Sequence, residues 1–174
     1  YTATRTFRAR VLGDTSGEGT TGLDEDYAAA YFEEVAAEIM GAGMFGLHQH
    51  GDDPDWRGWW GDEPPFHVPV FVLTHTPRAS IEFANGTVFH FIEATPEEAL
   101  ARATEAASGG DVRIGGGADV VRQFLRAGLI DRLHVAVAPL VIGSGERIWD
   151  GLRGIENDYA IRSEVAESGV THVT

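Results

Sequence analysis

Three consecutive glycines between a short strand and a helix form the segment of this sequence best suited to ligand chemistry. The strand is expected over Val112–Ile114, the glycines are Gly115–Gly117, and Asp119 lies in the first helical turn. Free N–H groups at a helix N-terminus attract phosphate because the positive end of the helix dipole lies there. The segment lacks the full G-x-G-x-x-G dinucleotide fingerprint, and the charge of Asp119 opposes a bound anion. A phosphate-binding turn and a tight turn without a ligand therefore both stay open.

A second polar segment, Thr74–Arg78, follows the strand expected over Val68–Leu73. It offers a guanidinium, an imidazole and two hydroxyls at the end of a strand. Ligands of open α/β sheets bind beyond the carboxyl ends of the strands, and this group of side chains suits the 2′-phosphate of an adenosine ribose. An ordinary polar turn is the alternative interpretation.

The long loop expected over residues 47–67 contains two further groups with chemical potential. His48 and His50 could bind a metal if they shared one face of a strand, but the neighbouring Asp, Gly and Pro residues favour a surface loop. Trp59 and Trp60 could stack on a flat heteroaromatic substrate or close over a pocket. Hydrophobic anchoring of the loop explains the same tryptophans equally well.

The composition excludes several classes of chemistry. All thirteen basic residues are Arg, and the sequence contains no Lys and no Cys. It therefore lacks the Lys of a Walker P-loop or a Schiff-base enzyme and the thiol of a cysteine enzyme or Cys-based zinc site. The formal net charge of −14 repels nucleic acid and anionic membranes. No apolar run is long enough to span a bilayer and no secretory signal is visible, so we expect a soluble, cytoplasmic protein.

These segments need a scaffold in which strands and helices alternate. A short ordered segment over residues 1–12 is followed by a Gly-rich loop, and a capping box at Thr95 begins an Ala-rich helix. The alternation predicts a largely parallel sheet with helices on both faces, in one domain of ordinary size. The expected strands are 38–40, 68–73, 88–92, 112–114 and 133–137, and the expected helices are 24–37, 96–108 and 118–127.

Several segments, spread over most of the chain, also carry a family resemblance. They are Glu38–Gly46, Trp59–His67, Pro69–Arg78, Asp111–Gly128 and Leu133–Gly145. Each is modest alone, but in their order and spacing they resemble the dihydrofolate-reductase-like family that includes the reductase domain of bacterial riboflavin biosynthesis.

The resemblance implies a single α/β domain over residues 1–174, with NADPH as hydride donor and a pteridine-like or pyrimidine-like substrate. Such an activity would be of the dihydrofolate reductase or 5-amino-6-(5-phosphoribosylamino)uracil reductase type. A homodimer is also implied, with Leu133–Ile142 as part of its face. Trp59 and Trp60 are the candidates for the substrate pocket. The implied cofactor-binding residues are Met40, Gly41, Ala42, Met44, Phe45, Thr74, His75, Arg78, Gly115, Gly116, Gly117, Ala118 and Asp119, and we expect Gly116 to approach the pyrophosphate most closely.

Two departures from the family pattern matter. Ala42 stands where relatives commonly carry an Arg, which removes one expected phosphate contact. The chain also begins at Tyr1 without the first strand that carries an acidic proton-transfer candidate in relatives, and it ends at Thr174 inside an apparent strand. We therefore expect residues to be missing at both ends and name no catalytic acid. A nucleotide-binding or regulatory module that has lost catalysis is the alternative function.

Overall fold

The computed structural model describes residues 1–174, and these form two compact units. The first comprises residues 34–129 and is called the parallel-sheet unit. The second comprises residues 1–33 and 130–174 and is called the terminal unit. The prediction of one domain over the whole chain stays a prediction.

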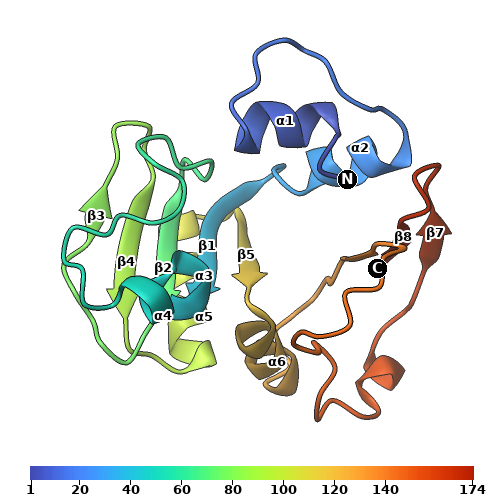
Figure 1. Ribbon diagram of the computed structural model, residues 1–174. Helices are drawn as coiled ribbons and strands as arrows, with labels where there is room; N and C mark the ends of the chain where they lie inside the picture. Colours follow the sequence, from blue (N-terminus) through green and yellow to red (C-terminus); the bar gives the residue numbers. More distant parts are fainter. The chain divides into compact units, whose positions relative to one another are not determined.

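The parallel-sheet unit contains a five-stranded sheet in the order β3-β4-β2-β1-β5 (Figure 1). Strands β4, β2, β1 and β5 are mutually parallel, and only the short β3 is antiparallel. The sequence therefore predicts the mixed, mainly parallel sheet correctly. The strand bounds are β1 Val35–Gly41, β2 Pro69–Leu73, β3 Ile81–Glu82, β4 Val88–Ile92 and β5 Asp111–Gly116.

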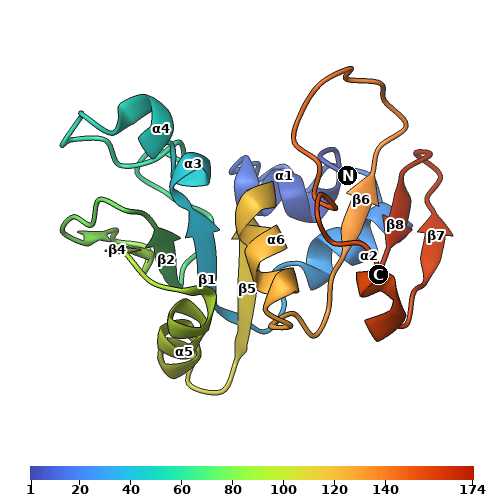
Figure 2. The same cartoon turned by 90° about the horizontal axis from the view of Figure 1, so that it is seen from below.

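Helices cover both faces of this sheet, as Figure 2 shows for α3–α4 and α5. On one face Met40, Val72 and Phe91 are register partners and are almost completely buried. Phe45 of α3 packs on this face, with its ring centroid 4.9 Å from that of Phe91. On the other side, Val120 of α6 packs against Gly41, and α5 contacts β1, β2 and β5. The helix bounds are α3 Ala42–Phe45, α4 Leu47–His50, α5 Pro96–Ala107 and α6 Ala118–Arg126.

Local sequence signals explain where the two longer helices begin and end. The Thr95 hydroxyl accepts from the Glu98 N–H and the Glu98 carboxylate accepts from the Thr95 N–H, which completes the predicted capping box. The predicted apolar face of α6 is buried through Val120, Val121, Phe124 and Leu125. The capping box therefore marks the start of α5, and the apolar periodicity identifies the buried face of α6.

The end of the helix that starts near Asp24 was predicted wrongly. α2 spans Leu23–Ala30, whereas residues 35–37 belong to β1. Glu34 has a φ of 58°, a left-handed conformation that does not continue a helix. Its carbonyl accepts from the Asp111 N–H, so pairing with β5 overrides the helical spacing of the apolar residues.

The terminal unit contains a separate three-stranded antiparallel sheet in the order β6-β8-β7. The strand expected over residues 133–137 does form as β6, but it pairs with β8 and not with the parallel sheet. An alternating apolar pattern identifies a strand without identifying its partner. Residues 1–12, expected only as an ordered segment, contain a helix. The bounds are α1 Arg5–Val11, α2 Leu23–Ala30, β6 Val135–Val137, η1 Ile155–Asp158, β7 Ser163–Val165 and β8 Thr171–Val173.

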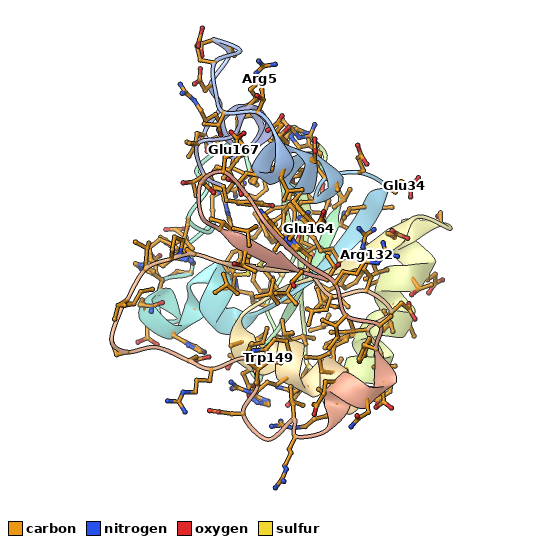
Figure 3. The ribbon with its side chains drawn as sticks, turned by 90° about the vertical axis from the view of Figure 1, so that its right-hand side faces the viewer. Arg5, Glu34, Arg132, Trp149, Glu164 and Glu167 are labelled. Atoms are coloured by element: carbon orange, nitrogen blue, oxygen red, sulfur yellow. The ribbon has the colours of Figure 1, made fainter.

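A hydrogen-bonded chain of titratable side chains lies inside the terminal unit. His172 Nε2 is 2.8 Å from Asp24 Oδ1, and His172 Nδ1 is 2.9 Å from His134 Nε2. The Tyr27 ring stacks on both imidazoles, and its hydroxyl donates to Glu164, which Figure 3 labels on β7. Asp24 and His172 are buried. These hydrogen-bonded side chains therefore link α2 to the antiparallel sheet, and their polar groups are hydrogen-bond partners of one another.

Candidate functional site

Parallel pairing brings the predicted site segments to one edge of the sheet. Because β1, β2, β4 and β5 run in the same direction, their carboxyl ends lie together. The residues that follow are Ala42–Phe45, Thr74–Arg78, Glu93–Thr95 and Gly117 with α6. This edge is where ligands of open α/β sheets bind. The three cofactor-binding segments expected from sequence are thus neighbours in space.

The glycine turn leaves open space in front of the α6 N-terminus. Gly117 is the N-cap of α6, and no side chain caps the helix. A Cβ built on Gly117 would meet nothing within 4 Å, and one on Gly116 would come no closer than 3.8 Å to Met44 Sδ. The first N–H groups of a helix have no intrahelical acceptor. The turn therefore leaves the space beside Gly117 open, and the first N–H groups of α6 have no side-chain cap.

The backbone conformation of Gly116 by itself favours glycine at this position. Its φ is 119°, a value that side-chain-bearing residues rarely adopt, and its peptide bond to Gly117 is cis. A substitution at Gly116 would be strained whether or not a ligand binds. Gly117 has a φ of −69° and carries no such restriction.

The charge of Asp119 is compensated within its own helix. Its carboxylate accepts from Gln123 Nε2 at 2.7 Å and from Arg122 at 3.1 Å. These hydrogen bonds, first from Gln123 and then from Arg122, lower the pKa of Asp119. The ion pair with Arg122 weakens the repulsion that Asp119 would exert on an anion at Gly117.

The predicted segment Met40–Phe45 contributes mainly backbone to this edge. The side chains of Met40 and Phe45 are completely buried in the aromatic core. Gly41 lets α6 approach β1, because a Cβ there would be 2.9 Å from Val120 Cγ2. Ala42 adds no polar group, and Met44 lies beside Gly116.

Arg78 makes different contacts from those expected for a phosphate ligand. Its guanidinium donates to the carbonyl oxygens of Trp56 and Asp53. It also lies 4.6 Å from the ring centroid of Phe91. Burial lowers the pKa of Arg78, against the opposing effect of the Asp53 charge. Arg78 therefore holds the long loop on the sheet.

His75 is the more exposed basic side chain of the same segment. Its side chain is 99% exposed, and its Nδ1 lies 3.3 Å from Glu93 Oε1. Thr74 accepts from the Thr76 N–H. Of the predicted adenosine-side residues, His75 is thus the one whose ring is open to a ligand.

The aromatic side chains of the long loop pack on one another, and the two candidate tryptophans, Trp59 and Trp60, differ in exposure. Trp60 stacks on Phe89 at 5.6 Å and anchors the loop, whereas Trp59 is 55% exposed. His50 stacks on Trp56 at 3.7 Å. No group of three or more His, Cys, Asp or Glu side chains has an arrangement that could hold a metal.

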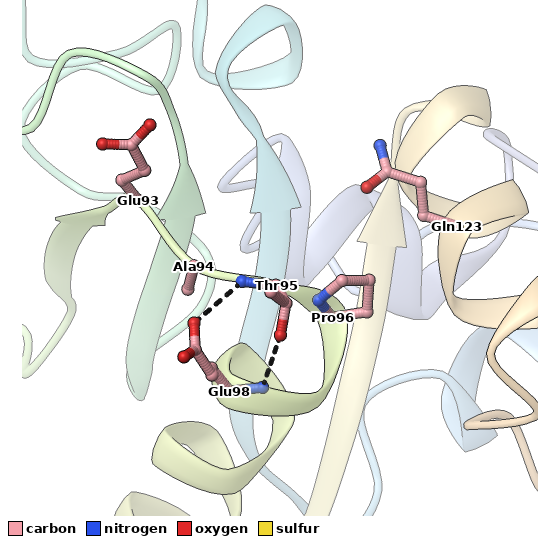
Figure 4. A pocket seen from close by; sticks show the side chains of 6 residues that line it. All are labelled: Glu93, Ala94, Thr95, Pro96, Glu98 and Gln123. Carbon is pink, nitrogen blue, oxygen red and sulfur yellow. Dashed lines mark hydrogen bonds between the residues drawn. The ribbon is translucent and has the colours of Figure 1, made fainter.

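An open pocket of about 430 Å³ lies at the carboxyl edge between α5 and α6 (Figure 4). Its carboxylates disfavour phosphate, so the glycine turn is the better anion site of the two. The lining residues are Glu93, Ala94, Thr95, Pro96, Glu98 and Gln123.

Sequence reasoning missed a buried ion pair beside the glycine turn. Glu38 in the middle of β1 is completely buried and pairs with Arg113 of β5. Burial raises the pKa of Glu38, and the Arg113 charge and hydrogen bond act against this. The sequence did carry a signal for this ion pair, because Glu38 and Arg113 each place a charge within a short, mostly apolar strand.

The mainly parallel sheet, with a glycine turn at its carboxyl edge, defines an α/β protein of the dihydrofolate-reductase-like fold. The family described as RibD C-terminal domain matches residues 8–168. The chain therefore belongs to this family, which is a family of reductases. No curated protein matches the chain.

Among the solved structures that resemble the chain are two bacterial proteins. One is a protein assigned to riboflavin biosynthesis from Shewanella sp. PV-4, with 20% identity, a TM-score of 0.59, and coverage of 99% of this chain and 89% of that chain. The other is a pyrimidine reductase-like protein from Corynebacterium diphtheriae, with 14% identity, a TM-score of 0.47, and coverage of 88% and 80%. The first supports the fold. No helix of the structure is long and apolar enough to cross a membrane.

Proposed function

We propose that the protein is an NADPH-dependent reductase of a pyrimidine-like or pteridine-like heterocycle. The observation that carries this proposal is the unobstructed glycine turn at the N-terminus of α6, at the carboxyl edge of a reductase-family sheet. The space beside Gly117 is open and the α6 N-terminus has no side-chain cap, so the first N–H groups of the helix are available to a pyrophosphate. NADPH, when bound, would supply the hydride.

The residues of the chain then have three tasks. Gly116 and Gly117 admit the pyrophosphate, and the first N–H groups of α6 hold it. The segment after β2, through His75, faces the adenosine end. The exposed ring of Trp59 offers a flat surface on which a heterocycle can stack. The protein mainly orients two planar rings and excludes water between them.

The decisive experiment is a screen of pyrimidines and pteridines for NADPH oxidation by the purified protein. We expect at least one pyrimidine-like compound to be reduced, and the Gly117 variant described below to lose this activity. Metal content is measured on the same preparation as a direct check on His48 and His50, which lie two residues apart on the helix α4 and therefore do not share a face. A protein that oxidises NADPH with none of the compounds and does not bind it would contradict the proposal.

A nucleotide-binding or regulatory module on the same fold is the second candidate. Ala42 favours this module, because its methyl side chain adds no positive charge at the edge of the sheet that would hold the cofactor. Both candidates bind NADPH, but only the reductase oxidises it. Tight NADPH binding without oxidation across the whole screen would identify the module.

We expect NADPH to bind more tightly than NADH by about tenfold, since a charge-assisted contact contributes about 1.5 to 3 kcal/mol. His75→Ala should reduce this ratio because the His75 ring is open to a 2′-phosphate. Arg78→Ala should instead lower the melting temperature and leave the ratio unchanged, because Arg78 holds the loop through Trp56 and Asp53. Fluorescence titration of both cofactors measures the ratio, and equal affinities in the native protein would remove the proposed adenosine role of Thr74–Arg78.

We also propose self-association through the segment after β6. Leu140, Val141 and Ile142 are 75%, 100% and 84% exposed, an apolar run that water solvates poorly. Light scattering at micromolar concentration should detect a dimer, and Val141→Asp should dissociate it. Leu12→Asp, at an exposed apolar residue outside this run, is the matched control. A monomer in the native protein would rule out this interface.

A further inference from the structure

Glu38 is a charged residue that is completely buried on an apolar face of the sheet, and this position needs an explanation. It shares a face of the sheet with its register partner Val70 and with Met40, both completely buried in the aromatic core. One carboxylate oxygen accepts from Arg113, and the other, Oε1, accepts no hydrogen bond. Apolar pairs often replace buried ion pairs without loss of stability. Stability alone therefore does not account for this carboxylate.

The unpartnered oxygen lies directly against the beginning of the glycine turn. A Cβ built on Gly115 would be 2.2 Å from Glu38 Oε1, so the carboxylate occupies the space that any larger residue would need. The register between β1 and β5 shifts at this point, because Ile39 pairs with Ile114 and Met40 with Gly116. Gly115 is the extra residue of this bulge.

The bulge determines how β5 leads into the ligand-facing turn. Gly116, with its positive φ, and Gly117, the N-cap of α6, follow Gly115 directly. A shift in the backbone at Gly115 would move the first N–H groups of α6 by a comparable amount. Those donors can hold an anion only in a narrow geometry.

We propose that Glu38, held by Arg113, is a positioning residue that supports the glycine turn from within the sheet. It does not touch the ligand. Its carboxylate fills the space beside Gly115 and so fixes the path of Gly115–Gly117 in front of α6. This inference rests on the proposed function for its ligand, NADPH, but its conformational part concerns the protein alone.

The test combines two substitutions, Gly115→Ala and Glu38→Asp, of which the second should reverse the effect of the first. Gly115→Ala should weaken NADPH binding by about tenfold or more, because the new Cβ displaces the Glu38 carboxylate and the turn with it. Glu38→Asp keeps the charge that Arg113 requires and withdraws the carboxylate from Gly115. The double variant should therefore bind NADPH within about threefold of Glu38→Asp alone. Glu38→Gln keeps the volume beside Gly115 but removes the charge opposite Arg113, so it should lower the melting temperature, while the folded variant should bind NADPH within about threefold of the native protein.

Hydrogen–deuterium exchange without cofactor separates this inference from the proposed function. Gly115→Ala should speed exchange at residues 115–119, and adding Glu38→Asp should slow it again, while melting temperatures show that each variant is folded. If the native protein does not bind NADPH but this exchange pattern appears, the proposed cofactor is wrong and the positioning role stands. Unchanged exchange in Gly115→Ala, or no rescue by Glu38→Asp, would overturn the positioning role.

Discussion

Gly117→Asp is expected to abolish NADPH binding while leaving the fold as stable as before, or more stable. Asp is a preferred N-cap residue, and its carboxylate interacts favourably with the helix dipole, which together contribute about 1 kcal/mol. The φ of −69° and the free space around Gly117 accept the side chain without strain. The same carboxylate would occupy and repel the phosphate, so we expect a loss of affinity of about a hundredfold or more.

Measuring affinity and melting temperature on one purified variant tests this result. If the turn binds no phosphate, Gly117→Asp should give the same gain in stability and leave the affinity for NADPH unchanged. Gly117→Ser is the matched control, because it caps the helix without adding a charge. Gly116→Val is less informative, because its φ of 119° makes the substituted turn strained and both quantities should fall.

Asp24→Ala should destabilise the terminal unit by about 2 to 3 kcal/mol. The substitution leaves the buried His172 ring without its acceptor, and an unsatisfied buried donor costs about 1–3 kcal/mol in addition to the lost packing. Asp26→Ala, an exposed acid on the same helix, should change stability little. Peptide-resolved hydrogen exchange should show faster exchange in β6 and β8 for Asp24→Ala. Equal exchange in the two variants would contradict a stabilising role for this chain of side chains.

The hydrogen-bonded side chains of Asp24, His172 and His134 should also make the stability of the terminal unit sensitive to acid. Burial, followed by the nearby His172 and Arg132 charges, lowers the pKa of His134. Between the lowered pKa of folded His134 and its unfolded pKa of about 6.5, the unfolded state therefore binds more protons, and stability falls as the pH decreases through this interval. Burial acts to raise the pKa of Asp24, but the hydrogen bonds from Ser168 and His172, together with the charges of the N-terminus and His172, outweigh it, and the pKa is lowered. The stability due to Asp24 is therefore present above its unfolded pKa of 3.8 and is lost as the pH falls through its lower, folded pKa.

Thermal unfolding at about pH 7.5 and about pH 5.5 measures the contribution of His134. His134→Gln should reduce the difference between the two melting temperatures. His75→Gln is the control, because the His75 side chain is 99% exposed. An undiminished difference in His134→Gln would show that another group causes the acid sensitivity.

Short-range patterns predicted the elements that depend only on short-range physics. The capping box at Thr95, the apolar face of α6 and the strand–glycine–helix order around Gly116 all follow from residues within a few positions of one another. The direction of the strands followed from their alternation with helices, and it placed the predicted segments at one edge. The sequence therefore determined which segments would lie together at the carboxyl edge of the parallel-sheet unit.

Only the tertiary structure decided which side chains at that edge remain free. Arg78 was expected to bind a phosphate, but carbonyl groups of the distant loop and the Phe91 ring engage it. The apolar spacing near Val35 predicted a helix, and pairing with β5 made it a strand. The position of Glu38 Oε1 beside Gly115 depends on the register between two strands that are far apart in sequence. Pairing partners, register and side-chain contacts arise from packing between distant segments, and no local pattern specifies them.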